Sequence, residues 1–229
     1  MKNAGAISGD IISYTALPTD DRRDLEKEIR QLLDILRKKY EDSRFFGRLV
    51  QGDHIECALD NPAYLLRIGL LLKTYIKSLD IPEGNALNKR TRLFREHGLR
   101  LAVAVAPMET IDARTGIIDG EAIQLTGRTI QNQDTSEKRN IIIKNTLFFK
   151  AADQRTEELF QPVVALLDIL LTKSSGKQCQ VVYHKLMGLD EAEIARKLNR
   201  SRSTINEHST AAGWHAIEKS VVYFEKYLK

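Results

Sequence analysis

The most constraining feature of this chain is the way the period of its apolar residues changes along the first 150 positions. A period of two residues indicates a strand, and a period near 3.6 indicates a helix. Their order predicts β-α-β-β-α-β-α-β, an α+β domain of the ferredoxin-like, split-βαβ kind with one added helix and strand. The expected strands are 4–14, 44–51, 54–60, 99–106 and 139–145, and the expected helices are 18–41, 62–78 and 121–133.

Two of these segments carry further local signals. In 18–41 a helical stripe is flanked by acidic residues at its start and lysines at its end, which suits the helix dipole. The two strand patterns at 44–51 and 54–60 are joined by a short Gly-Asp turn, which predicts a β-hairpin. The helical stripe of 18–41 consists of Leu25, Ile29, Leu32, Leu33 and Leu36.

A separate segment, residues 108–120, is rich in turn formers and is expected to form turns.

After about residue 150 the pattern is helical throughout. This change predicts three parts: an α+β domain over 1–152, a helical connector over 153–176, and a small all-α domain over 177–229. The polar segment 172–177, TKSSGK, is expected to be an exposed linker that a protease cuts first.

Composition excludes some classes of protein and leaves others open. The 229 residues carry a net charge of +4, shared almost equally between the two parts, so charge alone does not argue for nucleic-acid binding. Cys57 and Cys179 have neither disulfide nor zinc spacing and suit small core residues in a reducing compartment. No signal peptide or membrane span is expected, which predicts a cytoplasmic protein with no membrane partner.

The most specific motif is LDEAEIARKLNRSRSTINEH, at 189–208. Asp190 and Glu193 have the spacing of a reciprocal helix cap, and Ser201 can cap a second helix. Asn199 stands at the turn between them, where a left-handed residue is needed. The run from 178 to 218 resembles the helix-turn-helix of sigma-70 region 4, although Asn199 stands where glycine is usual.

This spacing predicts a recognition helix that binds double-stranded DNA. Arginine and asparagine side chains suit guanine and adenine edges, and a glutamate can accept from cytosine. The alternative is a helical bundle used for protein contacts or dimerisation. The predicted DNA-binding residues are Ser201, Arg202, Ser203, Asn206 and Glu207.

A carboxylate inside an apolar strand raises a second question. Asp10 stands among isoleucines in ISGDIISYT, where an unpaired charge is costly. Strand 4–14 and the predicted hairpin are neighbours in a split βαβ sheet, which can bring Asp10 and Asp53 together. Two close carboxylates suit Mg²⁺ or Mn²⁺, often shared with phosphates. Without a metal, Asp10 would pair with Arg or Lys, or would accept from backbone N–H groups.

The motifs GDIISYT, VQGDHIECAL and GEAIQLTGR resemble, in order, three motifs of class III nucleotidyl cyclases. The resemblance covers about residues 4 to 150 and implies a nucleotide site with metal at Asp10 and Asp53. If the site is active, Arg128 and Gln124 would be its catalytic residues, and the sites would form at a two-fold homodimer interface. The implied nucleotide-binding residues are Gly9, Ile11, Gly52, Gly120 and Arg128.

Departures from the cyclase pattern weaken the prediction of an enzyme. Val50 stands where a purine-reading Lys or Glu is usual, Gln124 stands where Asn is usual, and Ile117 stands near the place of a further base-reading acid. Such a domain followed by a helix-turn-helix also resembles the SatD family of bacterial proteins. We therefore expect a DNA-binding transcriptional regulator whose degenerate cyclase-like domain senses a nucleotide or dimerises. The alternatives are a phosphoryl-transfer enzyme with a targeting module, and a protein-interaction adaptor.

Overall fold

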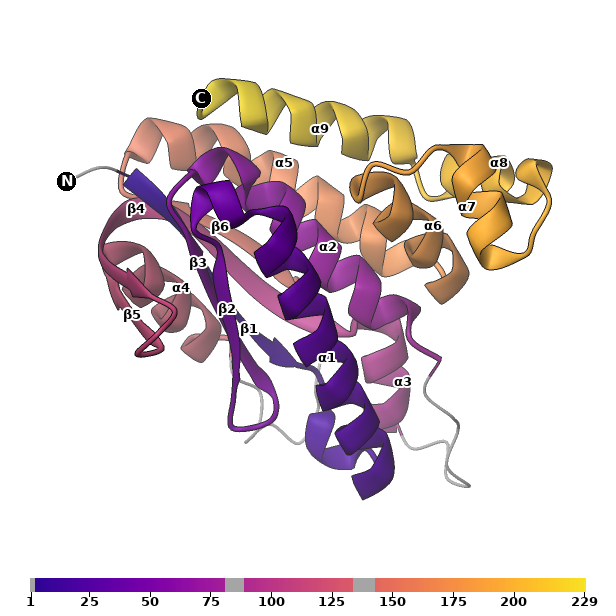
Figure 1. Cartoon of the computed structure of the whole chain (residues 1–229), viewed down its shortest axis with the longest axis horizontal. Coiled ribbons are helices and arrows are strands. Elements are labelled where there is room, and N and C mark those ends of the chain that lie inside the picture. Colours follow the sequence, from indigo (N-terminus) through magenta and orange to yellow (C-terminus); the bar gives the residue numbers. More distant parts are fainter. Residues whose placement is uncertain (1–2, 81–88, 134–142) are drawn as a thin grey trace.

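The sheet is built around β1 (Asn3–Ile11), which pairs with an antiparallel strand on each side. These neighbours are β3 (His54–Leu59) and β4 (Leu99–Asp112). β2 (Phe46–Val50) pairs with β3 in the predicted hairpin and forms one edge. Figure 1 shows the computed structural model of the chain, which describes residues 3–80, 89–133 and 143–229.

The far side of the sheet differs from the sequence prediction in two places. Residues 108–120, expected to be turns, continue β4 and return as β5 (Ile117–Gly120) in an antiparallel hairpin. The last strand is β6 (Leu147–Ala151), parallel to β4, so its expected position at 139–145 was wrong. Leu147 and Phe149 enter the core from alternate positions of β6, which fixes that strand, whereas 143–145 are not in a strand and 139–142 lie outside the described residues.

One face of the sheet is covered by α1 (Thr19–Lys39), α2 (Leu65–Ser78) and α5 (Gln154–Lys173). The predicted stripe of α1 is buried on this face, which confirms the helical prediction. Pro162 lies inside α5 without ending it. The short elements are η1 (Tyr14–Ala16), η2 (Glu41–Ser43), η3 (Pro62–Tyr64) and α3 (Lys89–His97).

The opposite face is covered near β1 and β4 by α4 (Glu121–Gln131). Small side chains make this close packing possible, because Ala6, Ala104, Ala106 and Ala122 form the contact between helix and sheet. A hydroxyl pair, Ser8 Oγ and Thr126 Oγ1 at 2.7 Å, lies at the same interface. The β2–β3 part of this face carries polar residues instead.

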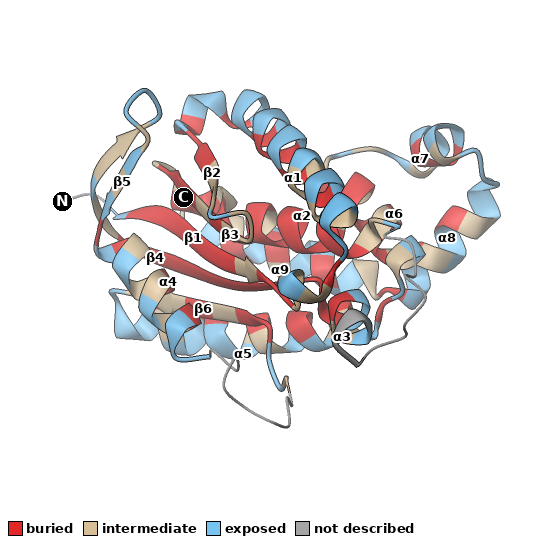
Figure 2. Ribbon diagram, turned by 90° about the horizontal axis from the view of Figure 1, so that it is seen from below, coloured by how far each residue is buried: buried red, intermediate tan, exposed pale blue. Residues whose placement is uncertain are grey.

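Four helices follow α5: α6 (Gly176–Leu186), α7 (Glu191–Leu198), α8 (Arg202–Ala211) and α9 (Trp214–Tyr227). α2, α5 and α9 each bury one side in a shared core. Figure 2 shows α7 and α8 extending to one end of the molecule. One core cluster runs from Ile7 of β1 to Phe224 of α9, so α6 and α9 share the core of the sheet. Among the described residues, every helix is too short or too polar to cross a bilayer.

The segment 172–177 consists of the end of α5 and the start of α6, with Ser174 and Ser175 between them. α5 extends to Lys173, and Ser175 caps α6 in a reciprocal capping box with Gln178. Between the two helices, Ser174 is 5% exposed. Lys77 Nζ of α2 donates to the carbonyls of Leu171 and Thr172 at 2.7 and 2.8 Å. The predicted division into three parts and its proposed cutting site stay predictions.

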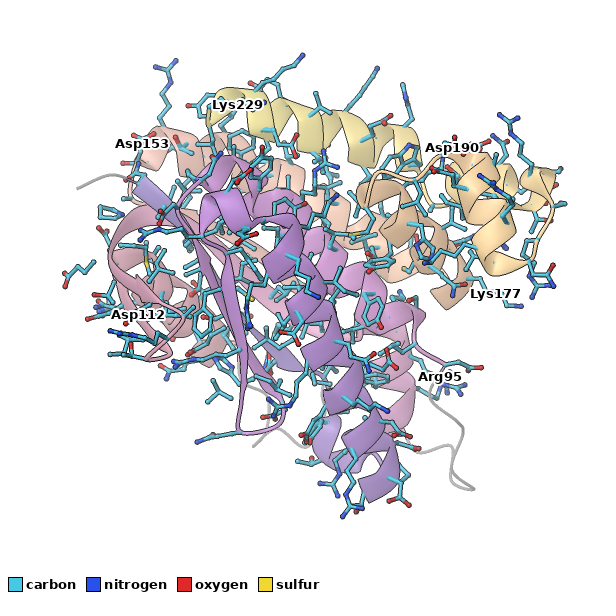
Figure 3. All side chains as sticks on the ribbon, viewed as in Figure 1. Arg95, Asp112, Asp153, Lys177, Asp190 and Lys229 are labelled. Atoms are coloured by element: carbon cyan, nitrogen blue, oxygen red, sulfur yellow. The ribbon has the colours of Figure 1, made fainter. Side chains whose placement is uncertain are left out.

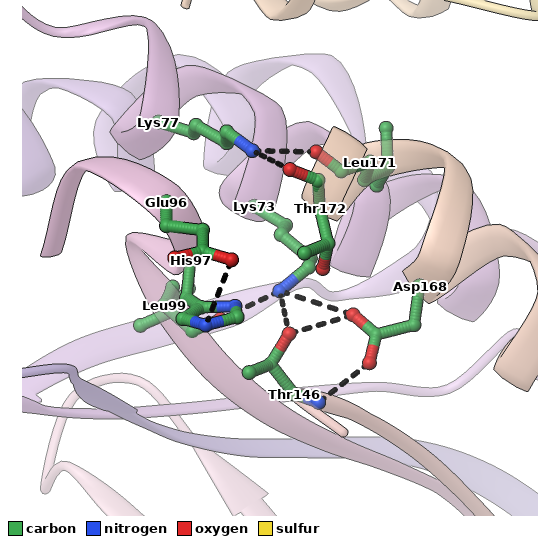
Figure 4. A network of polar contacts seen from close by, with 9 residues as sticks. All are labelled: Lys73, Lys77, Glu96, His97, Leu99, Thr146, Asp168, Leu171 and Thr172. Carbon is green, nitrogen blue, oxygen red and sulfur yellow. Dashed lines mark hydrogen bonds and ion pairs between the residues drawn. The ribbon is translucent and has the colours of Figure 1, made fainter. Parts of the chain in front are cut away.

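A buried ion pair joins α2 to α5 (Figure 4). Lys73 is 1% exposed, and its Nζ donates to the Leu99 carbonyl at 2.8 Å and to Thr146 Oγ1 at 2.5 Å. Asp168 lies 3.4 Å from the same ammonium group. The Asp168 carboxylate also accepts from the backbone N and the hydroxyl of Thr146, at 2.5 and 2.6 Å. Burial lowers the pKa of Lys73, and the charge of Asp168 opposes that shift.

We expect Asp168→Ala to lower the free energy of unfolding by about 3–5 kcal/mol, because it leaves the Lys73 charge buried without its partner. Urea denaturation followed by circular dichroism measures this loss. The matched control is Asp34→Ala, which removes the exposed Asp34–Arg37 pair of α1 at 3.3 Å. That control should change the free energy by less than about 1 kcal/mol. Equal effects of the two substitutions would contradict a special role for the buried pair.

Candidate functional site

The carboxylate of Asp10 is paired with a guanidinium group. Arg100 lies opposite Asp10 in the β1–β4 register, and its Nε and Nη2 donate to the two carboxylate oxygens at 2.8 and 2.5 Å. Arg100 also donates to the Gln133 carbonyl after α4. These charge-assisted hydrogen bonds satisfy both carboxylate oxygens, so this geometry accounts for the acid in ISGDIISYT. Arg100 was not singled out from the sequence.

Asp53 lies beside Asp10, at the turn of the β2–β3 hairpin. The Ile11 backbone N donates to the Asp53 carbonyl at 3.0 Å, which fixes the end of β1 to the turn. Burial raises the pKa of Asp53, and the negative charge of Asp10 raises it further. The two acids are therefore close enough to repel each other, as their places on neighbouring elements suggested.

A second ion pair continues along the same face of the sheet. Arg48 of β2 donates from Nε and Nη2 to Glu56 Oε2 of β3, at 2.8 and 2.6 Å, and donates from Nη1 to the Gly116 carbonyl. His54, opposite Asp10 in the β1–β3 register, lies 3.7 Å from Glu56. The charged strip therefore runs from Arg100 through Asp10 and His54 to Glu56 and Arg48. The two-residue period from His54 to Glu56 was the signal in the sequence that could have revealed it.

Asp10 and Asp53 would give a divalent cation only a small set of oxygen ligands. Within the part of the chain that the structure describes, no group of three His, Cys, Asp or Glu residues is placed to hold a metal ion. Asp10 has both oxygens on Arg100, so Asp53 is the remaining carboxylate of the predicted pair. A Mg²⁺ or Mn²⁺ ion needs about six oxygen ligands, so substrate and water would have to supply most of them. The described residues alone therefore supply few of the ligands that such an ion needs, and the predicted metal site stays a prediction.

The residues expected at a nucleotide lie on the elements around this strip. A Cβ at Gly9 would lie 2.4 Å from the Leu101 side chain, so glycine lets β1 and β4 approach there. Gly52 has φ +84° in the hairpin turn, a conformation that favours glycine. Ile11 is buried in the core, and Gly120 precedes α4. Their predicted role in nucleotide binding stays a prediction.

Gln124 and Arg128 lie on the exposed side of α4, whose buried side is Ala122, Thr126 and Ile130. Among the described residues, no hydrogen bond or ion pair joins Arg128 to Asp10 or Asp53. Within one chain, therefore, no such bond brings Arg128 to Asp10 or Asp53 among the described residues. Their predicted meeting across a two-fold interface stays a prediction.

The second candidate site is the unit formed by α7, α8 and the turn between them. Asp190 and Glu193 form the predicted capping box, and Ser201 accepts from the Thr204 backbone N at the start of α8. Asn199 has φ 50° and ψ 53°, the left-handed conformation expected at the turn. Figure 3 labels Asp190 at the start of α7, near the end of the molecule away from the sheet. The local predictions for this unit are confirmed.

The buried side of the α7–α8 unit holds the two helices together. Ile194, Ala195 and Ile205 pack with Val181 of α6 in a small cluster of their own. The predicted DNA-binding residues lie on the other side and are all exposed. Two of them contact Glu191 of α7. Asn206 Nδ2 donates to Glu191 Oε1 at 3.4 Å, and Arg202 Nε lies 3.9 Å from Glu191 Oε2.

No family model and no curated protein matches the chain. Among solved structures, one match is titled "Structure of a bacterial light-regulated adenylyl cyclase". It has a TM-score of 0.42 and 12% sequence identity, over 65% of this chain and 75% of that chain. Likeness at this level says nothing about the activity of this chain. The resemblances to the cyclases and to the SatD family stay predictions.

The Glu56 carboxylate is expected to make the free energy of unfolding depend on pH in the acid range. His54 and Arg48 lower the pKa of Glu56 to about 2, against the opposing effect of burial. A lowered carboxylate pKa contributes stability that is present above the ordinary value near 4.5 and is lost as the pH falls towards 2. We therefore expect the free energy of unfolding to fall between these two pH values, and to fall less in Glu56→Gln. Urea titrations across this range measure it, and parallel curves for the two proteins would contradict the expectation.

Proposed function

We propose that the chain is a DNA-binding transcriptional regulator in which α8 is the recognition helix. The observation that carries the proposal is the α7–α8 unit: a capped first helix, a left-handed Asn199 at the turn, and a second helix with Ile205 and Ser209 inward. The outward side of α8 carries Arg202, Ser203 and Asn206, which have the donors and acceptors that base edges require. Ser201 at its N-cap would lie near the phosphate backbone.

The charge around α8 indicates how such binding would behave. Residues 190–211 contain four basic residues (Arg196, Lys197, Arg200, Arg202) and four acidic ones (Asp190, Glu191, Glu193, Glu207), so phosphate attraction from this unit alone is weak. Sequence-dependent contacts would then supply more of the affinity than usual. A two-fold dimer would present two copies of α8 to half-sites about 34 Å apart or a multiple of that distance.

We expect Arg202→Ala to weaken binding to a selected duplex by roughly 1–3 kcal/mol, if Arg202 reads a base edge. The measurement is fluorescence anisotropy with a duplex obtained from a random-sequence selection. The control is Arg155→Ala, which removes an equally charged, exposed side chain from the start of α5. Loss of affinity in both variants would indicate general charge attraction. If the wild-type chain selects no duplex at low salt, the adaptor alternative replaces this proposal.

A second proposed function belongs to the sheet: it senses a nucleotide without turning it over. The observation in favour is the closeness of Asp10 and Asp53, with Asp53 partly protected from solvent. Turnover would need the attacking oxygen held in line with the phosphorus, and misplacement of this kind can cost ~10²-fold or more. Val50 and Gln124 do not supply the base and ribose contacts of the cyclase pattern.

We expect Mn²⁺ together with a nucleoside triphosphate to raise the melting temperature, and chromatography to find little or no cyclic product. Asp53→Ala should abolish the shift, whereas Asp24→Ala, which removes an exposed acid of α1, should leave it unchanged. Robust cyclic product that disappears in Asp53→Ala would promote the enzyme alternative. A wild-type chain that binds no nucleotide would leave Asp10 and Asp53 with a structural role only.

A further inference from the structure

A polar cavity lies where the sheet part of the molecule meets its C-terminal helices. Its volume is about 350 Å³, at the small end of the range for ligand sites. Segments far apart in the sequence contribute to it: the end of α1, the region from η3 into α2, the turn after α6, and α9 (Figure 1). Neither Asp10 nor the α7–α8 unit lines this cavity.

Tyr40 lines the cavity and has a buried hydroxyl that lacks a partner. Tyr40, at the end of α1, is 6% exposed, and its hydroxyl makes no hydrogen bond within the described residues. The charges of Arg67 and Glu225, which also line the cavity, both act on this hydroxyl. Burial raises the pKa of Tyr40 to about 12, so the group stays a neutral donor at physiological pH. A buried polar group without a partner is costly unless something binds to it.

Two cations also line the cavity. Lys39 Nζ donates to the Met187 carbonyl at 3.2 Å, which leaves two of its three N–H groups. Arg67 donates from Nε to Glu225 at 2.5 Å and from Nη1 to the Leu186 carbonyl at 3.2 Å, and no hydrogen bond from its Nη2 is found within the described residues. The side chains around the cavity therefore offer donors from Tyr40, Lys39 and Arg67, which suits an oxyanion.

The remaining walls limit the kind of anion. Tyr64 stacks at a tilt on Tyr40, with ring centroids 5.3 Å apart, and presents apolar surface with Met187. Asp42 and Glu225 also line the cavity, so a highly charged polyphosphate would meet two carboxylates. We propose that this cavity binds a small organic anion of low charge, through carboxylate or monophosphate oxygens that accept from Tyr40. The proposal does not depend on DNA binding or on the strip around Asp10.

The test is a thermal-shift screen of the full chain with millimolar L-glutamate, pyruvate, glycerol 3-phosphate and inorganic phosphate, at ionic strength matched with sodium chloride. At least one organic anion should raise the melting temperature. Comparing the carboxylate probes with the phosphate probes shows which oxyanion the cavity binds. A shift with inorganic phosphate alone would contradict the proposal of an organic ligand. ATP without a divalent ion should give no shift that depends on Tyr40.

Tyr40→Phe removes the hydroxyl and keeps the buried ring. It should weaken binding of the active probe by about tenfold or more, without lowering the melting temperature of the ligand-free chain. The matched control is Tyr223→Phe on α9, which alters a half-exposed tyrosine outside the cavity. Lys39→Ala should also weaken binding, whereas Lys38→Ala, one residue earlier on α1, should not. A shift that survives Tyr40→Phe, or no shift with any probe, would overturn the proposal.

Discussion

The position of α5 and the later helices against the sheet depends on the contacts of one buried group, the ammonium group of Lys73. It reaches the Leu99 carbonyl at the start of β4 and Thr146 just before β6, and it faces Asp168 of α5. Each of these partners belongs to a different part of the chain, so displacing one would leave a charge or a carbonyl unpaired in the core. Lys77, one turn later on α2, bonds the last carbonyls of α5 in the same way. Together the two lysines hold α5, and the helices that follow it, against the sheet.

The face of the sheet away from these lysines is divided by the size and charge of its side chains. Where β1 and β4 carry alanine, α4 lies close and excludes water. Towards β2 and β3 the same face carries Asp10, Glu56 and their arginine partners. Charged side chains in strands would be costly if they were unpaired, so the cross-strand pairs Asp10–Arg100 and Arg48–Glu56 are what allow this part of the face to stay polar. Any ligand at Asp10 has to compete with an arginine that already holds it.

The sequence predicted local features well and pairings between distant residues poorly. The stripe of α1, the β2–β3 hairpin, the caps at Asp190 and Ser201 and the left-handed Asn199 are written in spacings of a few residues, and they are confirmed. The partner of Asp10 lies 90 residues away and depends on strand register, which no local pattern gives. The β4–β5 hairpin was not predicted, because the turn-forming residues of 108–120 are more prominent than the weak alternation of apolar and polar residues there. Lys73 and Lys77 gave no sign of burial, since lysines in a helix are ordinarily exposed.

The shared core also decides which part of the C-terminal region is free to change position. Val182, Tyr183 and Leu186 of α6 belong to the main core, whereas Val181 of the same helix belongs to the small cluster with Ile194 and Ile205. α6 therefore has two faces, one fixed to α2 and the other holding the α7–α8 unit. The unit is joined to the rest of the molecule at two places: at α6 with the turn that follows it, and at Ala212, which joins α8 to α9 and belongs to the main core. That turn, at Met187 and Gly188, forms one wall of the cavity beside Tyr40. The cavity therefore lies beside one of the two connections between the α7–α8 unit and the rest of the molecule.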